Sequence, residues 1–159
     1  MKKLTFYSLL LGGALTLAAP SVFASDVPPA NAIPAATILQ NLQANGYTTV
    51  RKIEFDNGEY KVDALDANRK GVDLKIDPKT GNISKTRNSS GREVEAVGNA
   101  TLSALDIASK VQAAGYHNIY KIEAKEGKYE VKAVDAKNKE AALLVDGKTG
   151  DITKKTGLF

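Results

Sequence analysis

The 159-residue chain has no cysteine and no tryptophan, and it has only one methionine and one histidine. Without cysteine an exported protein has no disulfide to stabilise it, so its stability has to come from its hydrophobic core. The same absence excludes thiol redox chemistry, zinc sites built from cysteine, and a lipid anchor of the bacterial lipoprotein type. The groups that remain for chemistry are mainly carboxylates, lysines and tyrosines.

A strong charge of one sign is also lacking, since 22 lysines and arginines stand against 18 aspartates and glutamates, a formal net charge of +4. Basic and acidic residues alternate, as in Glu59-Tyr60-Lys61 and Lys128-Tyr129-Glu130. A nucleic-acid-binding protein usually gathers its lysines and arginines on one face, with aromatic residues between them. We therefore expect a solvated strand face and no nucleic-acid partner.

Long hydrophobic runs are scarce, and the longest one, Leu4–Ala19, follows two lysines at the amino end. Basic residues, an apolar stretch and small residues before a cleavage point make up a signal peptide. The pattern predicts that residues 1–24 are a signal peptide cleaved after Ala24, which leaves a periplasmic or secreted protein with a formal charge of about +2 and no membrane anchor. A retained anchor is the disfavoured alternative, because glycines and a proline interrupt the run.

The most informative feature is an internal repeat. Residues 46–86 align without a gap to residues 115–155, at a shift of about 69 residues and with about 19 identities. One shared stretch is the tripeptide Lys52-Ile53-Glu54, which recurs as Lys121-Ile122-Glu123. The chain is therefore expected to contain one supersecondary unit twice.

Each copy is expected to begin with a short amphipathic helix. Its apolar residues fall three and four positions apart on one stripe: Ala35, Ile38, Leu39 and Leu42 in the first copy, and Ala104, Ile107, Ala108 and Val111 in the second. Pro34 suits the first helical turn, and Ser103 with Asp106 resembles a capping box. Gly46 and Gly115 fit the left-handed position just beyond a helix end.

After each glycine the hydrophobic period changes to two, which predicts strands. A first strand over residues 50–55 is joined through Asn57-Gly58, a pair typical of tight hairpins, to a second strand over residues 59–64. A third strand and a short fourth follow in each copy. The third strand of the second copy, residues 141–145, is apolar on both faces, so we expect it to be covered on both sides.

The predicted fold class is α+β, with two tandem modules that each pack one N-terminal helix on an antiparallel sheet of three or four strands. The modules are assigned to residues 34–87 and 102–159, with a flexible tail at 25–33 and a linker at 88–101. A module of this size buries only about 60% of its chain surface, so each would be marginal alone, and docking of the two is expected.

Three features recur in the same order in both copies: the helix that ends at Gly46 or Gly115, the strands Tyr60-x-Val62 and Tyr129-x-Val131, and the turns Asp77-x-x-Thr80-Gly81 and Asp146-x-x-Thr149-Gly150. In this order they resemble the PepSY family, which occurs in the propeptides of secreted metallopeptidases and in free-standing bacterial envelope proteins. The resemblance implies binding of a peptide or peptidase, often with inhibition, and supplies no catalytic residue. Because no peptidase domain follows Phe159, we do not expect a propeptide acting in cis.

The side chains that suggest chemistry are better explained as scaffold. His117 has Thr48 at the corresponding position of the other copy, so no histidine-based dyad or triad is available. Gly147-Lys148-Thr149-Gly150 superficially matches a phosphate-binding loop, but it lacks the upstream glycine and reads as a hairpin turn.

Four aspartates and four tyrosines leave alternatives open. Asp66, Asp77, Asp135 and Asp146 could contribute to a calcium site, but turn capping fits their positions better. The tyrosines at 47, 60, 116 and 129 could anchor a partner, but their repetition in register favours packing in the core or against a helix end. We therefore assign no catalytic, cofactor-binding or metal-binding residue, and we leave the partner-binding residues unknown.

The function predicted from these features is a non-catalytic periplasmic binding module that engages or inhibits a peptidase, or binds an extended peptide at the edge of a sheet. We expect the first copy to supply the contact surface and the second to act mainly as scaffold. The alternative is a structural or regulatory envelope protein that acts through self-association or a signalling partner. An enzyme is the least favoured class, because the acids lie in turns without a recognisable partner base.

Overall fold

The computed structural model describes residues 26–89 and 100–156. The expected signal peptide and most of the expected linker lie outside these residues, and the bounds assigned to the segments remain predictions. The first half contains α1 (Ala35–Ala44), β1 (Thr49–Asp56), β2 (Glu59–Leu65), β3 (Gly71–Ile76) and β4 (Ile83–Asn88). The second half contains α2 (Ala104–Ala113), β5 (His117–Lys125), β6 (Lys128–Val134), β7 (Glu140–Asp146) and β8 (Ile152–Lys154).

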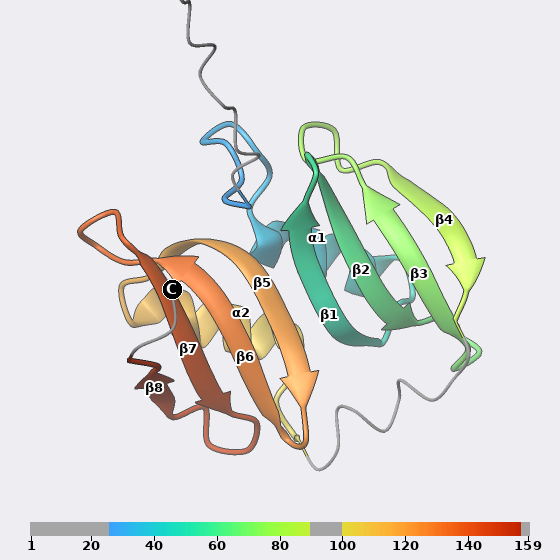
Figure 1. Ribbon diagram of the computed structural model, residues 1–159. Helices are drawn as coiled ribbons and strands as arrows, with labels where there is room; N and C mark the ends of the chain where they lie inside the picture. The colour runs from blue at the N-terminus through green and yellow to red at the C-terminus, as the bar shows by residue number, and fades with distance from the viewer. Residues whose placement is uncertain (1–25, 90–99, 157–159) are drawn as a thin grey trace, which may run out of the picture.

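The strands of both halves form one eight-stranded sheet in the order β4-β3-β2-β1-β5-β6-β7-β8, and every neighbouring pair is antiparallel. The α+β class predicted from the sequence is confirmed. Each half is a meander that starts at the centre of the sheet and runs outward, so β4 and β8 are the two edges (Figure 1).

The two halves meet at a seam between β1 and β5. Lys52 pairs with Glu123, Ile53 with Ile122 and Glu54 with Lys121, so the repeated Lys-Ile-Glu tripeptides lie opposite each other. Because the strands are antiparallel, each lysine faces a glutamate and the two isoleucines face each other, as in a two-fold symmetric dimer. Docking of the two copies therefore takes the form of a continuous sheet.

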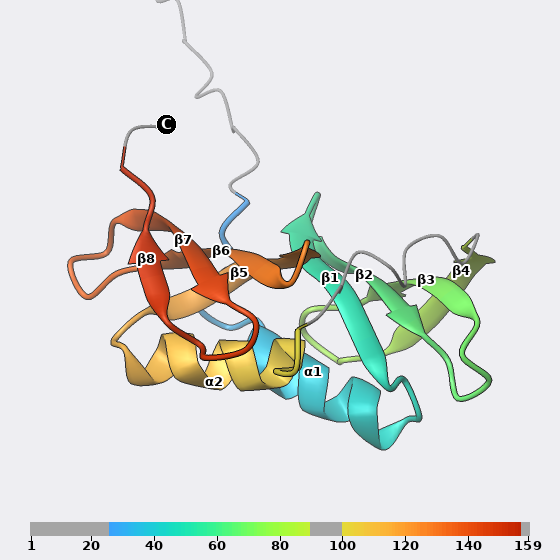
Figure 2. The ribbon, with the colours of Figure 1, turned by 90° about the horizontal axis from the view of Figure 1, so that it is seen from below.

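Both helices cover the same face of the sheet. The sheet lies in front of the helices in Figure 1 and above them in Figure 2. The apolar stripes predicted for the helices are buried in both, and they join alternate residues of the strands in one hydrophobic core that spans both halves. The opposite face carries no helix among the described residues, and we call it the open face.

The ends of the helices follow the sequence signals closely. Ser103 and Asp106 form the predicted capping box at the start of α2. At the end of α1, Gly46 has a φ of 87°, and the amides of Gly46 and Tyr47 donate to the carbonyls of Gln43 and Leu42. This is the Schellman arrangement, which needs a left-handed residue and explains the glycine in both copies.

The chain that precedes each helix is tied to the sheet by a tyrosine. The Tyr60 hydroxyl donates to the Ile33 carbonyl at 2.9 Å, and the Tyr129 hydroxyl donates to the Leu102 carbonyl at 2.7 Å. Ile33 and Leu102 occupy equivalent positions in the two copies. The repeated tyrosines therefore fix the position at which the chain enters each helix.

Residues 26–33 were expected to be an extended, mobile tail, but they lie against the body of the protein. Pro28 is buried, and Val27 and Ile33 pack against the hydrophobic core. The Ile33 amide also donates to the Pro78 carbonyl at 2.7 Å. The proline and alanine content suggested mobility, but the side chains of Val27 and Ile33 pack against the core and hold this segment in place.

The expectation that β7 is covered on both sides is wrong. Ala141, Leu143 and Val145 are buried under the helices, but Ala142 and Leu144 are only half-buried, on the open face. Within residues 26–89 and 100–156, no helix or second sheet lies over this side of β7.

The seam can be tested by truncating its paired isoleucines. Ile53 and Ile122 are 1% and 0% exposed. We expect Ile53→Ala or Ile122→Ala to lower the free energy of unfolding by about 2–4 kcal/mol, because each leaves a cavity in the core. Chemical denaturation measures this loss. Leu144→Ala, a truncation on the open face, should cost clearly less, and equal losses at all three positions would contradict the assigned seam.

Candidate binding surfaces

The four aspartates singled out from the sequence are turn caps. In each of them one carboxylate oxygen, Oδ1, accepts hydrogen bonds from two backbone amides, two to four residues further along the chain: Asp66 from Asn68 and Lys70, Asp77 from Lys79 and Thr80, Asp135 from Lys137 and Lys139, and Asp146 from Lys148 and Thr149. Backbone donation, from Thr80 and Thr149 first, lowers the pKa of Asp77 and Asp146. Within residues 26–89 and 100–156, no three acids or histidines come together as a metal site would need.

The repeated tyrosines belong to the scaffold. Tyr60 and Tyr129 are 1% exposed, and burial raises the pKa of Tyr60 to about 12. Tyr47 and Tyr116 are half-buried and pack against the core, next to the glycine that ends each helix. Tyr120, which the sequence analysis did not single out, is also buried, and its hydroxyl donates to the Glu140 carboxylate at 3.0 Å.

His117 and the loop that resembles a phosphate site also have structural positions. His117 is exposed at the start of β5, and its Nε2 lies 3.3 Å from Oδ1 of Asn138. In the turn after β7, the amides of Lys148 and Thr149 point at the Asp146 carboxylate. A phosphate would need these same donors, so the turn is closed by its own aspartate.

The seam carries an ion-pair network on the open face. Lys121 Nζ lies 2.9 Å from Glu123 and 3.5 Å from Glu54, across the seam. Arg51 pairs with Asp63 in its own half and lies 3.7 Å from Glu123 in the other half. Sequence reasoning missed this network, although the repeated Lys-Ile-Glu tripeptide carried the signal, because it pairs lysine with glutamate when it is placed antiparallel to itself.

These ion pairs keep the seam glutamates ionised. Burial opposes the ionisation of Glu54, but the hydrogen bond from Lys52 and the charges of Lys121 and Lys52 outweigh it and lower the pKa of Glu54. Burial likewise opposes the ionisation of Glu123, and Lys121 outweighs it, so the pKa of Glu123 is lowered as well. The seam is therefore stabilised by charge as well as by its buried isoleucines.

Two matching cavities lie where one half meets the other. One, of about 200 Å³, lies between Pro34 before α1 and residues 117–119 of β5. Its counterpart, of about 220 Å³, lies between Ser103 before α2 and residues 48–50. The repeat relates their linings, including Tyr60 in the first and Tyr129 in the second. Small-molecule sites usually measure about 300–1,000 Å³, so both are small for a cofactor.

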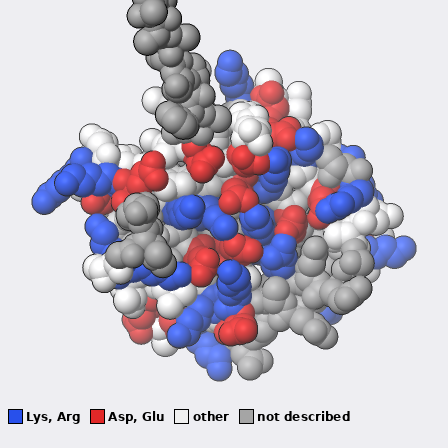
Figure 3. Space-filling view, in the orientation of Figure 1, with Lys and Arg blue, Asp and Glu red and all other residues white. Residues whose placement is uncertain are grey.

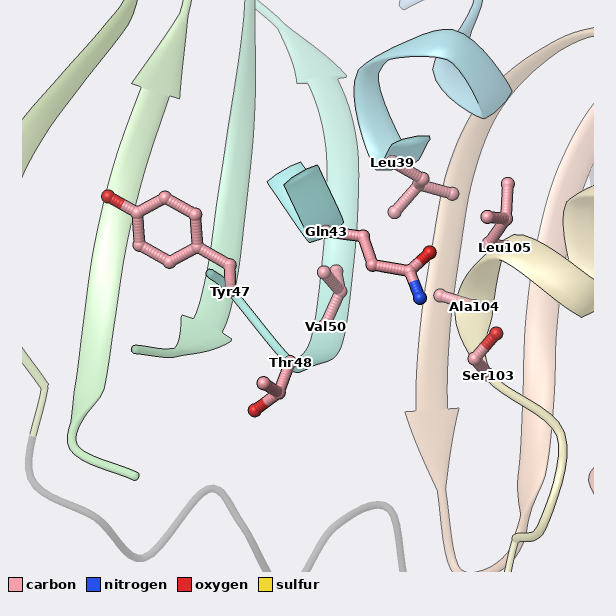
Figure 4. A pocket seen from close by; sticks show the side chains of 8 residues that line it. All are labelled: Leu39, Gln43, Tyr47, Thr48, Val50, Ser103, Ala104 and Leu105. Atoms are coloured by element: carbon pink, nitrogen blue, oxygen red, sulfur yellow. The ribbon is translucent and has the colours of Figure 1, made fainter. Parts of the chain in front are cut away.

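A still smaller hollow of about 40 Å³ separates the end of α1 from the start of α2. The Gln43 side chain extends toward Ala104 across it, with Val50 below (Figure 4). This volume suits about three or four water molecules, since one water needs about 10–15 Å³ on this scale. The space between the helices is therefore a packing gap and not a ligand site.

The sheet edges differ in length. Strand β4 covers six residues, of which Ser84, Lys85, Arg87 and Asn88 are exposed, whereas β8 covers three. A hollow of about 520 Å³ lies beside the start of β4, between two hairpin turns, and Ile76 and Ile83 are among the residues that line it. The β4 edge thus combines unpaired backbone with a hollow large enough for a side chain.

The comparisons with known proteins bear on the whole chain. A PepSY family model, described as peptidase propeptide and YPEB domain, matches residues 8–87 and 90–156. Among solved structures, a "putative lipoprotein" from Clostridium difficile 630 matches with 16% identity and a TM-score of 0.38, covering 80% of this chain and 96% of its own. No curated protein matches the chain. Neither described helix has the length and apolar character needed to span a membrane.

The ion-pair network at the seam predicts how stability depends on pH. A carboxyl whose pKa is lowered by folding stabilises the protein above its unfolded value of about 4.5, and this contribution is lost as the pH falls through the folded value. The double variant Glu54→Gln/Glu123→Gln should lose about 1 kcal/mol at pH 7 and show a shallower decline in unfolding free energy between about pH 5 and 3.

Denaturant unfolding at several pH values measures this effect. Glu126→Gln, in the exposed hairpin turn after β5, removes one charge away from the seam and serves as the control. An unchanged slope in the double variant would mean that the seam glutamates do not contribute to acid unfolding.

Proposed function

The chain belongs to the PepSY family of peptidase propeptide and YPEB domains, as its motifs predicted, and from this membership we propose that it binds an extended polypeptide segment by strand addition at β4. The family consists of propeptide-like modules that are generally non-catalytic and typically extracellular or periplasmic. In this proposal the chain is exported, its signal peptide is removed after Ala24, and its target is a peptidase or a peptide in the envelope.

The observation that carries the proposal is the exposed β4 edge. Strand addition needs a row of unpaired backbone donors and acceptors, and antiparallel pairing supplies affinity without any catalytic group. The inner edges of the two halves pair with each other at the seam, which leaves β4 and β8 as the edges of the sheet. Of the two, β4 is twice as long, and it lies in the first half, where the sequence analysis expected the contact surface.

Side chains on β4 would select the added segment. Lys85 and Arg87 are exposed, although Arg87 also pairs with Asp73 of β3, and β4 contains no acidic residue. Lysine and arginine on an edge strand discourage unselective pairing between sheets. An added strand with acidic residues would meet this charge favourably, and an apolar side chain near its end could enter the hollow beside Ile83.

Inhibition would follow from exclusion. A peptidase cleft binds its substrate in extended form, so a peptidase segment held on β4, or β4 presented to the cleft, blocks access without covalent chemistry. The modest cavities between the halves and the turn-capping role of the aspartates favour this mode over binding of a small molecule.

The proposal is tested with purified residues 25–159 against envelope peptidases, by inhibition of peptide hydrolysis and by binding measured with surface plasmon resonance. Lys85→Pro removes a backbone donor and disturbs β4, so we expect it to weaken binding at least tenfold. Lys154→Pro is the matched control, because Lys85 and Lys154 are equivalent in the repeat and pair with the equivalent leucines 74 and 143.

Thermal unfolding of both variants checks that the fold is retained. Weakening by Lys154→Pro alone would move the binding edge to β8. If the wild-type chain neither binds nor slows any envelope peptidase, the proposed function fails.

A further inference from the structure

The open face has a charge pattern that the proposed function does not use. In sheet order, the five strands β3, β2, β1, β5 and β6 each include, among the charged residues of this face, one pair of opposite charges two positions apart. On β7 the corresponding pair is apolar. The pairs are Asp73 and Lys75, Lys61 and Asp63, Lys52 and Glu54, Lys121 and Glu123, Glu130 and Lys132, and Ala142 and Leu144. None of these side chains lies under the helices.

The strand register arranges these residues in two rows that run from β3 to β7. On the edge strand β4, Ser84 lies opposite Lys75 and Arg87 lies opposite Asp73. The basic row contains Lys75, Lys61, Glu54, Lys121 and Lys132. The acidic row contains Asp73, Asp63, Lys52, Glu123 and Glu130. Each row has four charges of one sign and one of the other, and Figure 3 shows the face on which they lie.

This arrangement has a cost within one molecule. Lys61 lies directly opposite Lys75, and Asp63 lies directly opposite Asp73; two further like-charged pairs follow in the second half. Like charges directly opposite each other destabilise a sheet. Ion pairs relieve much of this repulsion, but they do not require that the lysines share one row. Asp73 pairs with Arg87, Asp63 with Arg51, Lys75 with Glu59, and Lys52 with Glu54.

The separation of the rows comes from differences between the two copies. The two-fold relation at the seam exchanges the rows, so two identical copies would give them equal charge. At two positions, however, the copies carry opposite signs, since Lys61 corresponds to Glu130 and Asp63 to Lys132. These reversals make one row basic and the other acidic.

From this pattern we infer that the open face docks on the open face of a second copy of the chain. A two-fold axis that runs along the rows, midway between them, places the basic row of each copy on the acidic row of the other. Lys61 then faces Asp63 of the second copy, Lys121 faces Glu123, and Lys132 faces Glu130. The one residue in each row whose charge differs from the rest also meets an opposite charge, because Glu54 faces Lys52 of the second copy.

Every charged position in the rows thus meets its opposite, and on β7 Ala142 meets Leu144. Stacked sheets lie about 10 Å apart with their strands about 30° from parallel, so the twist limits close contact to the central strands. Lysine side chains are long enough to reach across that distance. The interface is polar and hydrated, which makes the dimer weak and sensitive to salt.

Sedimentation velocity tests the inference. We expect the wild-type chain to form dimers at about 20 mM salt and the dissociation constant to rise at least tenfold at about 500 mM, where charges are screened within a few ångströms. The variant Lys61→Glu/Lys132→Glu reverses two positions of the basic row and should weaken dimers at least tenfold. The variant Asp63→Lys/Glu130→Lys should do the same, and Glu130→Lys alone replaces it if the double variant does not fold.

The deciding experiment is an equimolar mixture of the two double variants, in which every reversed charge again faces its opposite. We expect the mixture to form dimers although neither variant does so alone. Lys79→Glu/Lys148→Glu changes the net charge as the first variant does, but in the exposed turns after β3 and β7, and it should leave dimerisation unchanged. A monomeric wild-type chain at low salt, no rescue in the mixture, or equal rescue by this control would overturn the inference.

Discussion

The pairing of β1 with β5 is the interaction on which the rest of the structure depends. Three residue pairs join two small units into one sheet with a common core beneath it. If either half stood alone, β1 or β5 would be an exposed edge strand, and the apolar side chain of Ile53 or Ile122 would lie at that edge. Their pairing removes that edge, extends the hydrophobic core across both halves, and moves the free edges to β4 and β8, far from the centre.

The same pairing divides the molecule into surfaces with different capacities. The helix-covered face is committed to the core, and its hollows are small. The edge strands β4 and β8 present backbone hydrogen-bonding groups, and β4 is the longer of the two. The open face presents charged side chains. The proposed binding at β4 uses backbone groups, whereas the proposed docking uses side chains of the open face, so a chain of this kind could hold a polypeptide segment and a second copy at once.

Local features could be read from the sequence, and long-range ones could not. The helix stripe, the capping box at Ser103 and the left-handed glycines act over a few residues, so spacing and residue type determine them. The seam joins strands far apart in the chain, and neither periodicity nor turn chemistry specifies which strand pairs with which. Leu144 shows a further limit, because a strand with apolar residues on both faces can still have one of those faces only half-buried. The turn caps could be read from the positions of the aspartates, and the burial of Tyr60 and Tyr129 from their repetition in register.

Covalent fusion of the two halves has a consequence for how the molecule can change. In a dimer of identical chains every substitution appears on both sides of the axis, so a side chain suited to one side is imposed on the other. Here position 51 carries an arginine that bridges the halves, while its counterpart, Tyr120, is buried and bonded to Glu140. One linked chain lets a near-symmetric framework specialise each side separately, and the two sides of its axis are free to acquire different tasks.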